Sequence, residues 1–455
     1  MNKTPKAQEV NLSYAWFVVA ILMLAYISSF IDRQILSLLV RPIRRDFEIS
    51  DTQMSLLMGL SFAVFYTILG IPIGRLADHK SRKWIISVGI LVWSMMTVLC
   101  GVAANYGQLF LARVGVGIGE AALAAPAYSL ISDYFPREKL GLAISVFSMG
   151  IYIGSGLAFF LGGIVISLSS GEDHLLIPWI GEIYSWQIVF FIIGFPGILI
   201  ALLVYLTVKE PERKNGFSQK TSISKDALVP MRADFSEVIG YIWANRGAFL
   251  GITLGLTFVS LIAYGSAAWI PTFLQRVYGW SPEQAGISYG LVVTVFATLG
   301  IIAGGLYADR LSHRYEDGRI RSMIIAPIGL LVTGLYYPFM PTGYLSVLFL
   351  IPACFFISFP VGTAAATLQE IFPNHMRAAA SSIYLFILNL IAMSLGPTSV
   401  ALCTDYVFKN DAMIGYSLTI VGFVCVLIAT LSFYLSAKPY CQSKKNLEEY
   451  LKKYA

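Results

Sequence analysis

The stretch that decides the fold is the first apolar run, residues 13–40. It reads SYAWFVVAILMLAYISSFIDRQILSLLV, with Asp32 and Arg33 as its only charged residues. A helix needs roughly 20 mostly apolar residues to cross a bilayer, and this run is longer than that. It is also too long for the apolar part of a signal peptide, and it shows no cleavage site. We therefore expect a membrane-spanning helix that carries two charges.

Eleven similar runs follow the first one. Of all residues, 57% are hydrophobic and 13% are charged, whereas a soluble domain carries about 25% charged residues. Backbone polar groups in lipid must be bonded internally, which favours helices, and a β-barrel would show short alternating segments instead. The sequence predicts an all-α membrane protein with twelve transmembrane helices in two six-helix bundles. The predicted runs cover residues 13–40, 52–75, 84–104, 107–131, 140–168, 185–208, 247–274, 284–307, 322–340, 344–369, 378–403 and 412–436.

The distribution of Lys and Arg predicts the orientation, because cytoplasmic segments carry an excess of both. With both termini cytoplasmic, most of the 32 Lys and Arg residues fall on the inside. The exceptions outside are Arg41, Arg44, Arg45, Arg276 and Lys409, so the first outer loop runs against the rule. We expect a multi-pass protein of the cell membrane. The net charge of +6 is then a topology signal, and we expect no nucleic-acid partner.

A polar stretch in the middle of the chain divides the runs six and six. It extends from Lys209 to about Asp234, is rich in Lys and Ser and contains two prolines, which is typical of a linker. Apolar residues then recur at helical spacing from Phe235, which indicates an amphipathic helix on the membrane surface. The predicted units are a first bundle, a linker with this helix, a second bundle and a cytoplasmic C-terminal tail, at residues 1–208, 209–245, 246–436 and 437–455.

Two loop signatures occur once in each half. Gly74-x-x-x-Asp78 follows the second run and Gly305-x-x-x-Asp309 follows the eighth. Likewise Asp133-Tyr-Phe-Pro136 follows the fourth run and Glu370-Ile-Phe-Pro373 follows the tenth. Internal repeats are typical of secondary transporters, whose substrate site lies between the repeats near the bilayer midplane.

Residues 74–83, GRLADHKSRK, resemble the signature loop of the major facilitator superfamily, although His79 and Ser81 depart from its usual pattern. We expect Gly74 to let its helix approach a neighbour closely and Asp78 to meet a helix N-terminus or a loop arginine. Such contacts would hold the inner side closed in one state and break in the other. The expected gating residues are Gly74, Asp78, Arg82, Arg137, Asp309 and Arg310.

Three further motifs resemble the spinster branch of that superfamily. They are Phe30-Ile-Asp32-Arg33, the stretch RVGVGIGE at residues 113–120, and Asp133-Tyr-Phe-Pro136. Spinster-like proteins transport lysophospholipids and sphingosine phosphate, with proton coupling in some. The resemblance therefore implies an amphiphilic, lysolipid-like substrate, with protons and the lipid bilayer as further partners.

Four charges lie within the apolar runs: Asp32, Arg33, Arg113 and Glu120. Each costs about 2.5–3.5 kcal/mol near the bilayer centre on insertion scales, so such residues are functional candidates. A carboxyl group whose pKa is raised by burial and lowered by an arginine suits proton coupling, and we assign this role to Asp32 and Glu120. Arg33, Arg113 and Glu120 are the expected substrate contacts. Structural ion pairs that merely join helices are the alternative.

The second half contains no charged residue in its runs before Glu370. A charged wall facing an uncharged wall suits an amphiphile, although the second bundle could simply pack tightly. Two other functions remain open: a small organic-anion or multidrug transporter of the same fold, and a membrane sensor or scaffold without transport. We find no nucleophile paired with a base and no metal-spaced cluster, and the glycines at 115, 117 and 119 lack a nucleotide-binding context. We expect neither enzymatic activity nor a cofactor, and we expect a monomer.

Overall fold

The computed structural model describes residues 12–169, 174–177, 181–211, 235–373 and 375–454. Its helices and strands are α1 Leu12–Gln34, η1 Ile35–Ser37, α2 Val40–Phe47, α3 Asp51–Met58, α4 Leu60–His79, α5 Arg82–Cys100, α6 Tyr106–Glu120, α7 Ala124–Tyr134, α8 Arg137–Ser169, β1 His174–Ile177, β2 Gly181–Tyr184, α9 Gln187–Thr207, α10 Phe235–Ala244, α11 Arg246–Tyr278, α12 Pro282–Val292, η2 Val293–Ala297, α13 Thr298–Ser312, α14 Gly318–Gly329, η3 Leu330–Gly334, η4 Tyr337–Phe339, α15 Gly343–Ser358, α16 Val361–Gln369, α17 Arg377–Leu402, η5 Cys403–Phe408, η6 Asp411–Met413 and α18 Ile414–Tyr454.

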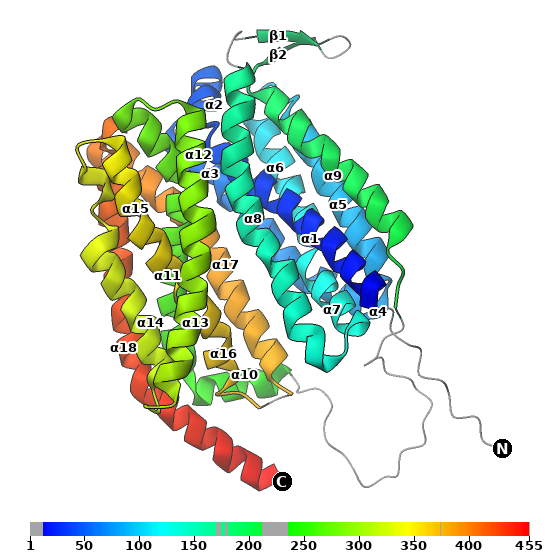
Figure 1. The fold of residues 1–455 in the computed structure, drawn as a ribbon, viewed down its shortest axis with the longest axis vertical. Coiled ribbons are helices and arrows are strands. Elements are labelled where there is room, and N and C mark those ends of the chain that lie inside the picture. Colours follow the sequence, from blue (N-terminus) through cyan, green and yellow to red (C-terminus); the bar gives the residue numbers. More distant parts are fainter. Residues whose placement is uncertain (1–11, 170–173, 178–180, 212–234, 374, 455) are drawn as a thin grey trace, which may run out of the picture.

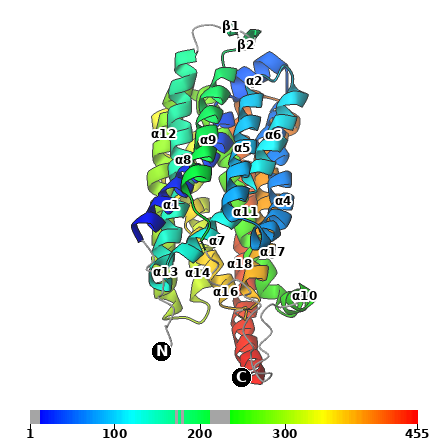
Figure 2. The same cartoon turned by 90° about the vertical axis from the view of Figure 1, so that its right-hand side faces the viewer.

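Twelve segments of the described chain are long and apolar enough to cross a membrane, which confirms the prediction of twelve spans. The spans form two bundles that lie side by side, α1 to α9 in the first and α11 to α18 in the second (Figures 1 and 2). We call the face where α1 begins and α18 ends the terminal face. The opposite face carries α2 and a small antiparallel β1–β2 hairpin, and we call it the hairpin face. The sequence did not predict this hairpin.

The region around the linker differs in part from the prediction. Helix α10, Phe235–Ala244, forms where an amphipathic helix was expected, with Val238 buried and Trp243 exposed. Residues 212–234 of the linker lie outside the described part. The predicted tail at 437–455 is not a separate segment, because α18 continues through it to Tyr454. Its last turns are held to the second bundle, where Asn446 donates to Asn245.

Side-chain caps fix several of the helix starts. Ser50 accepts a hydrogen bond from the backbone N–H of Gln53, whose side chain accepts from the Ser50 N–H, and this capping box starts α3. The side chain of Asn105 caps α6 by accepting a hydrogen bond from the backbone N–H of Gln108. Helix α6, which carries two of the four predicted intramembrane charges, therefore has a defined register.

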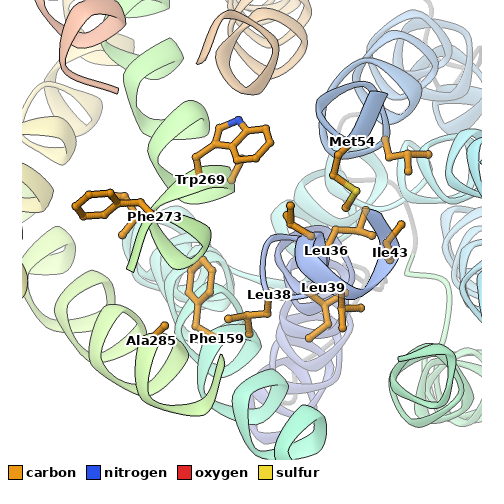
Figure 3. Close-up of a cluster of buried hydrophobic side chains, with 14 of the residues drawn as sticks. Leu36, Leu38, Leu39, Ile43, Met54, Phe159, Trp269, Phe273 and Ala285 are labelled. Carbon is orange, nitrogen blue, oxygen red and sulfur yellow. The ribbon is translucent and has the colours of Figure 1, made fainter. Parts of the chain in front are cut away.

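The two bundles share one apolar core in their hairpin-face half. Figure 3 draws part of this core, in which Leu36, Ile43 and Met54 of the first bundle belong to the same buried cluster as Trp269 and Phe273 of α11. All five side chains are fully buried, and between membrane-spanning helices such close van der Waals packing is one of the contributions that favour association. This half of the interface is therefore closed.

Among the described residues, the hydrogen bonds between the bundles lie in the same half. Within the described residues, they join positions 37–55 of the first bundle to α11, α17, η5 and η6. The buried Asp51 accepts a bidentate pair from Arg276 at 2.6 and 2.7 Å, and Arg44 Nη1 donates to Asp411 Oδ2 at 2.5 Å. Asp405 accepts from the backbone N–H and the hydroxyl of Thr52. The molecule is thus latched on its hairpin face.

Candidate functional site

The centre of the site is an ion pair between α1 and α6. Arg33 Nε donates to Glu120 Oε2 at 2.6 Å, and the hydroxyl of Ser29 donates to the same oxygen at 2.6 Å. Ser29 and Glu120 are buried, while the Arg33 side chain is 11% exposed. Arg33, predicted to bind substrate, is therefore occupied by a carboxylate predicted to respond to protons.

Three aromatic rings surround the guanidinium of Arg33. Its Cζ lies 4.7 Å from the ring centroid of Phe30 and 4.6 Å from those of Phe62 and Tyr66. Such rings attract a cation through their quadrupoles, so the rings and Glu120 together hold Arg33. Sequence reasoning missed this aromatic cage, because Phe62 and Tyr66 come from a different span than Arg33.

Asp32 and Arg113 lie beside this pair with fewer partners. Arg113 Nη1 donates to the backbone carbonyl of Asp32 at 3.1 Å, and both side chains are buried. Among the described residues, neither carboxylate oxygen of Asp32 meets a hydrogen-bond donor, and Glu120 Oε1 and Arg113 Nε also lack partners. Unmet buried polar atoms of this kind are expected to bind water, a proton or a ligand group. The four predicted charges therefore form one connected cluster.

Glycines in α6 bring its charged residues up against α4 and α5. A Cβ placed on Gly117 would lie 2.7 Å from the carbonyl oxygen of Phe62, and one on Gly119 would lie 2.5 Å from the backbone nitrogen of Trp93. Only glycine permits such contacts, so these two positions let α6 approach its neighbours closely. Helix α6 ends at Glu120, and α7 begins only at Ala124. Glu120 thus sits at a break in the fourth span.

The charged cluster borders a small cavity between the two bundles. Arg33, Arg113 and Phe62 form one wall, and Tyr264 of α11 and Met393 of α17 belong to the other. The second-bundle wall also contains Ala267, Ala268 and Pro397, and none of its residues is charged. The cavity volume is about 40 Å³, room for no more than about three water molecules. A larger ligand requires the bundles to move.

The gating candidate Arg82 makes its contacts within the first bundle. At the start of α5, its guanidinium donates to Asp133 Oδ2 at 2.5 Å, to Glu210 Oε1 at 2.8 Å and to the hydroxyl of Ser129 at 3.0 Å. Glu210 also accepts from the backbone N–H of Lys83. The Arg82 cluster ties α5 to α7 and to the end of α9, so it braces one bundle.

The second bundle has a matching cluster around Arg319. Arg319 Nε donates to Glu370 Oε1 at 2.6 Å, and its Nη2 lies 3.4 Å from Asp309 Oδ1. Arg319 follows Arg82 at the same residue offset that separates Glu370 from Asp133. That offset was the signal by which the sequence could have identified Arg319, which we missed. Arg310, the expected gating residue, is exposed instead.

The close approach expected at Gly74 is not made in this conformation. A Cβ on Gly74 would meet no atom within 4 Å, and the same holds for Gly305 in the other repeat. The reason is that the bundles are joined at the hairpin face, whereas both glycines lie toward the terminal face. The side chains of Asp78 and Arg137 lie outside the described part, so their gating role stays a prediction.

Comparisons with known proteins extend over almost the whole chain. A family model for the Major Facilitator Superfamily matches residues 22–397. An MFS-type efflux pump of Mycolicibacterium smegmatis is 27% identical over 94% of this chain and 93% of its own length. Protein spinster homolog 1 of Xenopus tropicalis is 26% identical over 92% of this chain and 80% of that protein. A crystal structure of a bacterial homolog of the human lysosomal transporter spinster, inward-facing and unoccupied, matches with a TM-score of 0.74 at 28% identity, covering 95% of this chain and 97% of that one.

Proposed function

This chain belongs to the Major Facilitator Superfamily and resembles its spinster transporters, and on that premise we propose that it is a proton-responsive carrier of a lysophospholipid-like or sphingoid-phosphate-like amphiphile. The observation that supports this proposal is the Arg33–Glu120 ion pair at a cavity whose opposite wall is uncharged. Transport would proceed by alternating access, with this cavity opening to each face in turn.

The ion pair provides the proton response. While Glu120 is ionised, it holds Arg33 and keeps this guanidinium from a substrate anion. Protonation of Glu120 removes the negative partner, so the guanidinium becomes available to an anionic head group. Asp32, whose carboxylate oxygens lack donors among the described residues, is the second proton-responsive group, and Arg113 supplies its counter-charge. A substrate anion thus exchanges places with an ionised carboxylate.

The uncharged wall accommodates the tail of the amphiphile. Tyr264, Ala268 and Met393 face the charged cluster across the cavity, and methionine adapts readily to ligands of varying shape. The latch on the hairpin face leaves the terminal face as the route of entry in this conformation. With both termini cytoplasmic, this conformation is the inward-facing one.

The proposal is tested by uptake of labelled lysophospholipid into proteoliposomes, with and without a pH gradient. We expect wild type to respond to the gradient, Glu120→Gln to lose that response, and Arg33→Ala to lose uptake by about tenfold or more. Arg246→Gln, an exposed residue at the start of α11, is the matched control and should behave as wild type. Equal transport by all four proteins would contradict the site assignment.

Two alternatives have distinct outcomes in the same assay. An anion or drug carrier is favoured by the similarity to an efflux pump, and it predicts competition by water-soluble compounds without competition by lysolipids. A sensor or scaffold predicts no flux of any compound and no change in cavity accessibility. Each outcome excludes the lysolipid carrier.

A further inference from the structure

The arginines that run against the charge rule all line one cavity at the hairpin face. Arg41, Arg44 and Arg45 come from α2, and Arg276 comes from the end of α11. The cavity has a volume of about 650 Å³, within the range of about 300–1,000 Å³ that is usual for small-molecule sites. It lies on the interface between the bundles and shares no lining residue with the central cavity. The remaining lining residues are Glu48, Ile49, Thr272, Gln275, Asn410, Asp411 and Ala412.

The four arginines differ in how far their charges are satisfied. Arg276 is fixed by its bidentate contact with the buried Asp51. Arg44 donates from Nε to the carbonyl of Ile49 at 3.1 Å and from Nη1 to Asp411. Arg45 pairs with Asp46, and Arg41 is exposed and makes no ion pair among the described residues. Carboxylates thus hold Arg276 and Arg44 in place, whereas the guanidinium of Arg41 is available to bind a further anion.

The charge on the lining favours an anion. Glu48 and Asp411 are the carboxylates of the lining itself, and the Asp411 side chain is 53% exposed. Asp46 and Asp51 pair with Arg45 and Arg276 from outside the lining, so the charge left unpaired among the described residues is that of Arg41. Arg44 is held by Asp411 and Asp51: burial lowers its pKa, but the hydrogen bond to Asp411 and the nearby carboxylates outweigh burial and raise the pKa. Guanidinium groups bind phosphate in bidentate geometry, and Thr272, Gln275 and Asn410 can hydrogen-bond the hydroxyls of a polar alcohol.

We propose that this cavity binds a phosphate-bearing anion, held by Arg41 and Arg45 and completed by Arg44 and Arg276. The phosphate can come from a lipid head group in the adjacent leaflet or from a free phosphate ester, since the recognising chemistry is the same. The site is separate from the proposed transport function, because no residue of the central cluster belongs to it.

Arg44 links this site to the latch between the bundles. It lines the cavity and also donates to Asp411, which belongs to the other bundle. A bound anion competes with Asp411 for the same guanidinium, so occupancy weakens one of the bonds that close the hairpin face. Removing the charges of Arg41 and Arg45 should therefore weaken anion binding, whereas removing the charge of Asp411 should strengthen it.

The experiment measures binding of inorganic phosphate and of glycerol phosphate to the full-length protein in micelles of an uncharged, phosphate-free detergent, at fixed low salt. We expect saturable binding to wild type, about tenfold weaker binding to the Arg41→Gln/Arg45→Gln double variant, and severalfold tighter binding to Asp411→Asn. Arg246→Gln, which removes one positive charge from the other end of α11, should bind as wild type does. Thermal unfolding of each variant checks that it is folded, and Arg41→Gln alone serves if the double variant is not.

A second arm distinguishes the two sources of phosphate. In nanodiscs that contain anionic lipid, loss of phosphate binding to wild type identifies a lipid head group as the occupant, while unchanged binding identifies a soluble phosphate ester. The proposal is overturned if wild type shows no saturable binding in the phosphate-free micelles. It is also overturned if Arg246→Gln weakens binding as much as the double variant, or if Asp411→Asn does not tighten it. None of these measurements depends on lysolipid flux.

Discussion

The two bundles share the same loop signatures, yet they differ in the kinds of side chain that they bury. In the described part, all buried charged side chains belong to the first bundle. They include Asp32, Arg113 and Glu120, which is the partner of Arg33. The second bundle instead carries three π-helical turns, at Val293–Ala297, Leu330–Gly334 and Cys403–Phe408. Buried charges need partners in fixed positions, whereas π turns loosen a helix and often occur at functional sites. One repeat therefore provides charge and the other an adaptable backbone.

The largest expected effect comes from comparing two substitutions, one that removes a buried charge from the first bundle and one that removes a buried hydroxyl from the second. Glu120→Leu leaves Arg33 without its carboxylate, and breaking a buried ion pair costs about 3–5 kcal/mol. Thr367→Val in α16 removes a fully buried hydroxyl that donates to the carbonyl of Thr363, which should cost about 1 kcal/mol. Reversible unfolding in mixed micelles gives both free energies. Similar losses of unfolding free energy in the two variants would show that both bundles are equally sensitive to the removal of a buried polar group.

The Arg82 cluster and the matching cluster around Arg319, both at the terminal face, should give the next largest difference in the free energy of unfolding. Arg82 and Asp133 are buried, so Arg82→Gln should lower the free energy of unfolding by about 3 kcal/mol. Arg319 is 18% and Glu370 is 31% exposed, and solvent screening should limit the cost of Arg319→Gln to about 1 kcal/mol. The same unfolding measurement compares them, with Arg246→Gln as the control for lost surface charge. A larger loss for Arg319→Gln would reverse the comparison.

Two glycine substitutions should shift the balance of conformations in opposite directions. A Cβ on Gly286 would lie 2.3 Å from the carbonyl oxygen of Phe159 across the closed interface, so Gly286→Ala should disfavour this state by roughly tenfold. Gly74→Ala meets nothing here, and we expect it to favour this state a few-fold by obstructing the approach that closes the terminal face. Spin-label distances between Lys139 and Arg314 report both shifts. A shift in the same direction for both would exclude this account of Gly74.

The smallest expected effect is a pH dependence at Glu210. Burial raises its pKa, but the hydrogen bonds from the Lys83 N–H, Arg82 and Ser81 outweigh burial and lower the pKa below the usual value of 4.5. Because the folded pKa is the lower one, Glu210 stabilises the protein above pH ~4.5, and this contribution is lost as the pH falls through the folded pKa. Its side chain is 30% exposed, so Glu210→Gln should cost no more than about 1 kcal/mol at pH 7. The difference from wild type should vanish in unfolding experiments at acidic pH.

The number of spans and the location of the charges could be predicted because both depend on local composition. Apolar length alone identifies a span, and Asp32, Arg33, Arg113 and Glu120 stand out within apolar runs. Which charges pair with each other was harder to predict from the sequence. The sequence shows two guanidinium groups and two carboxylates in apolar runs, but only the three-dimensional placement of α1 and α6 selects the Arg33–Glu120 contact.

Features that depend on distant segments could not be predicted from one sequence. The cage around Arg33 needs Phe62 and Tyr66 from another span, and the latch between Arg44 and Asp411 joins residues from opposite bundles. The continuation of α18 was missed because a polar segment after a span resembles a tail. Its helix is maintained by tertiary contacts such as that between Lys444 and Glu370.

The length of α18 makes it a lever. Its 41 residues extend about 60 Å at 1.5 Å per residue, roughly twice the thickness of a bilayer's hydrocarbon core. Tyr450 donates to Glu237 of α10, so the projecting part turns with its own bundle. A rotation of about 10° around the hairpin end would then move the far tip by about 10 Å. A fluorophore at the exposed Glu449 would therefore magnify a small rocking motion into a displacement that single-molecule measurements can follow.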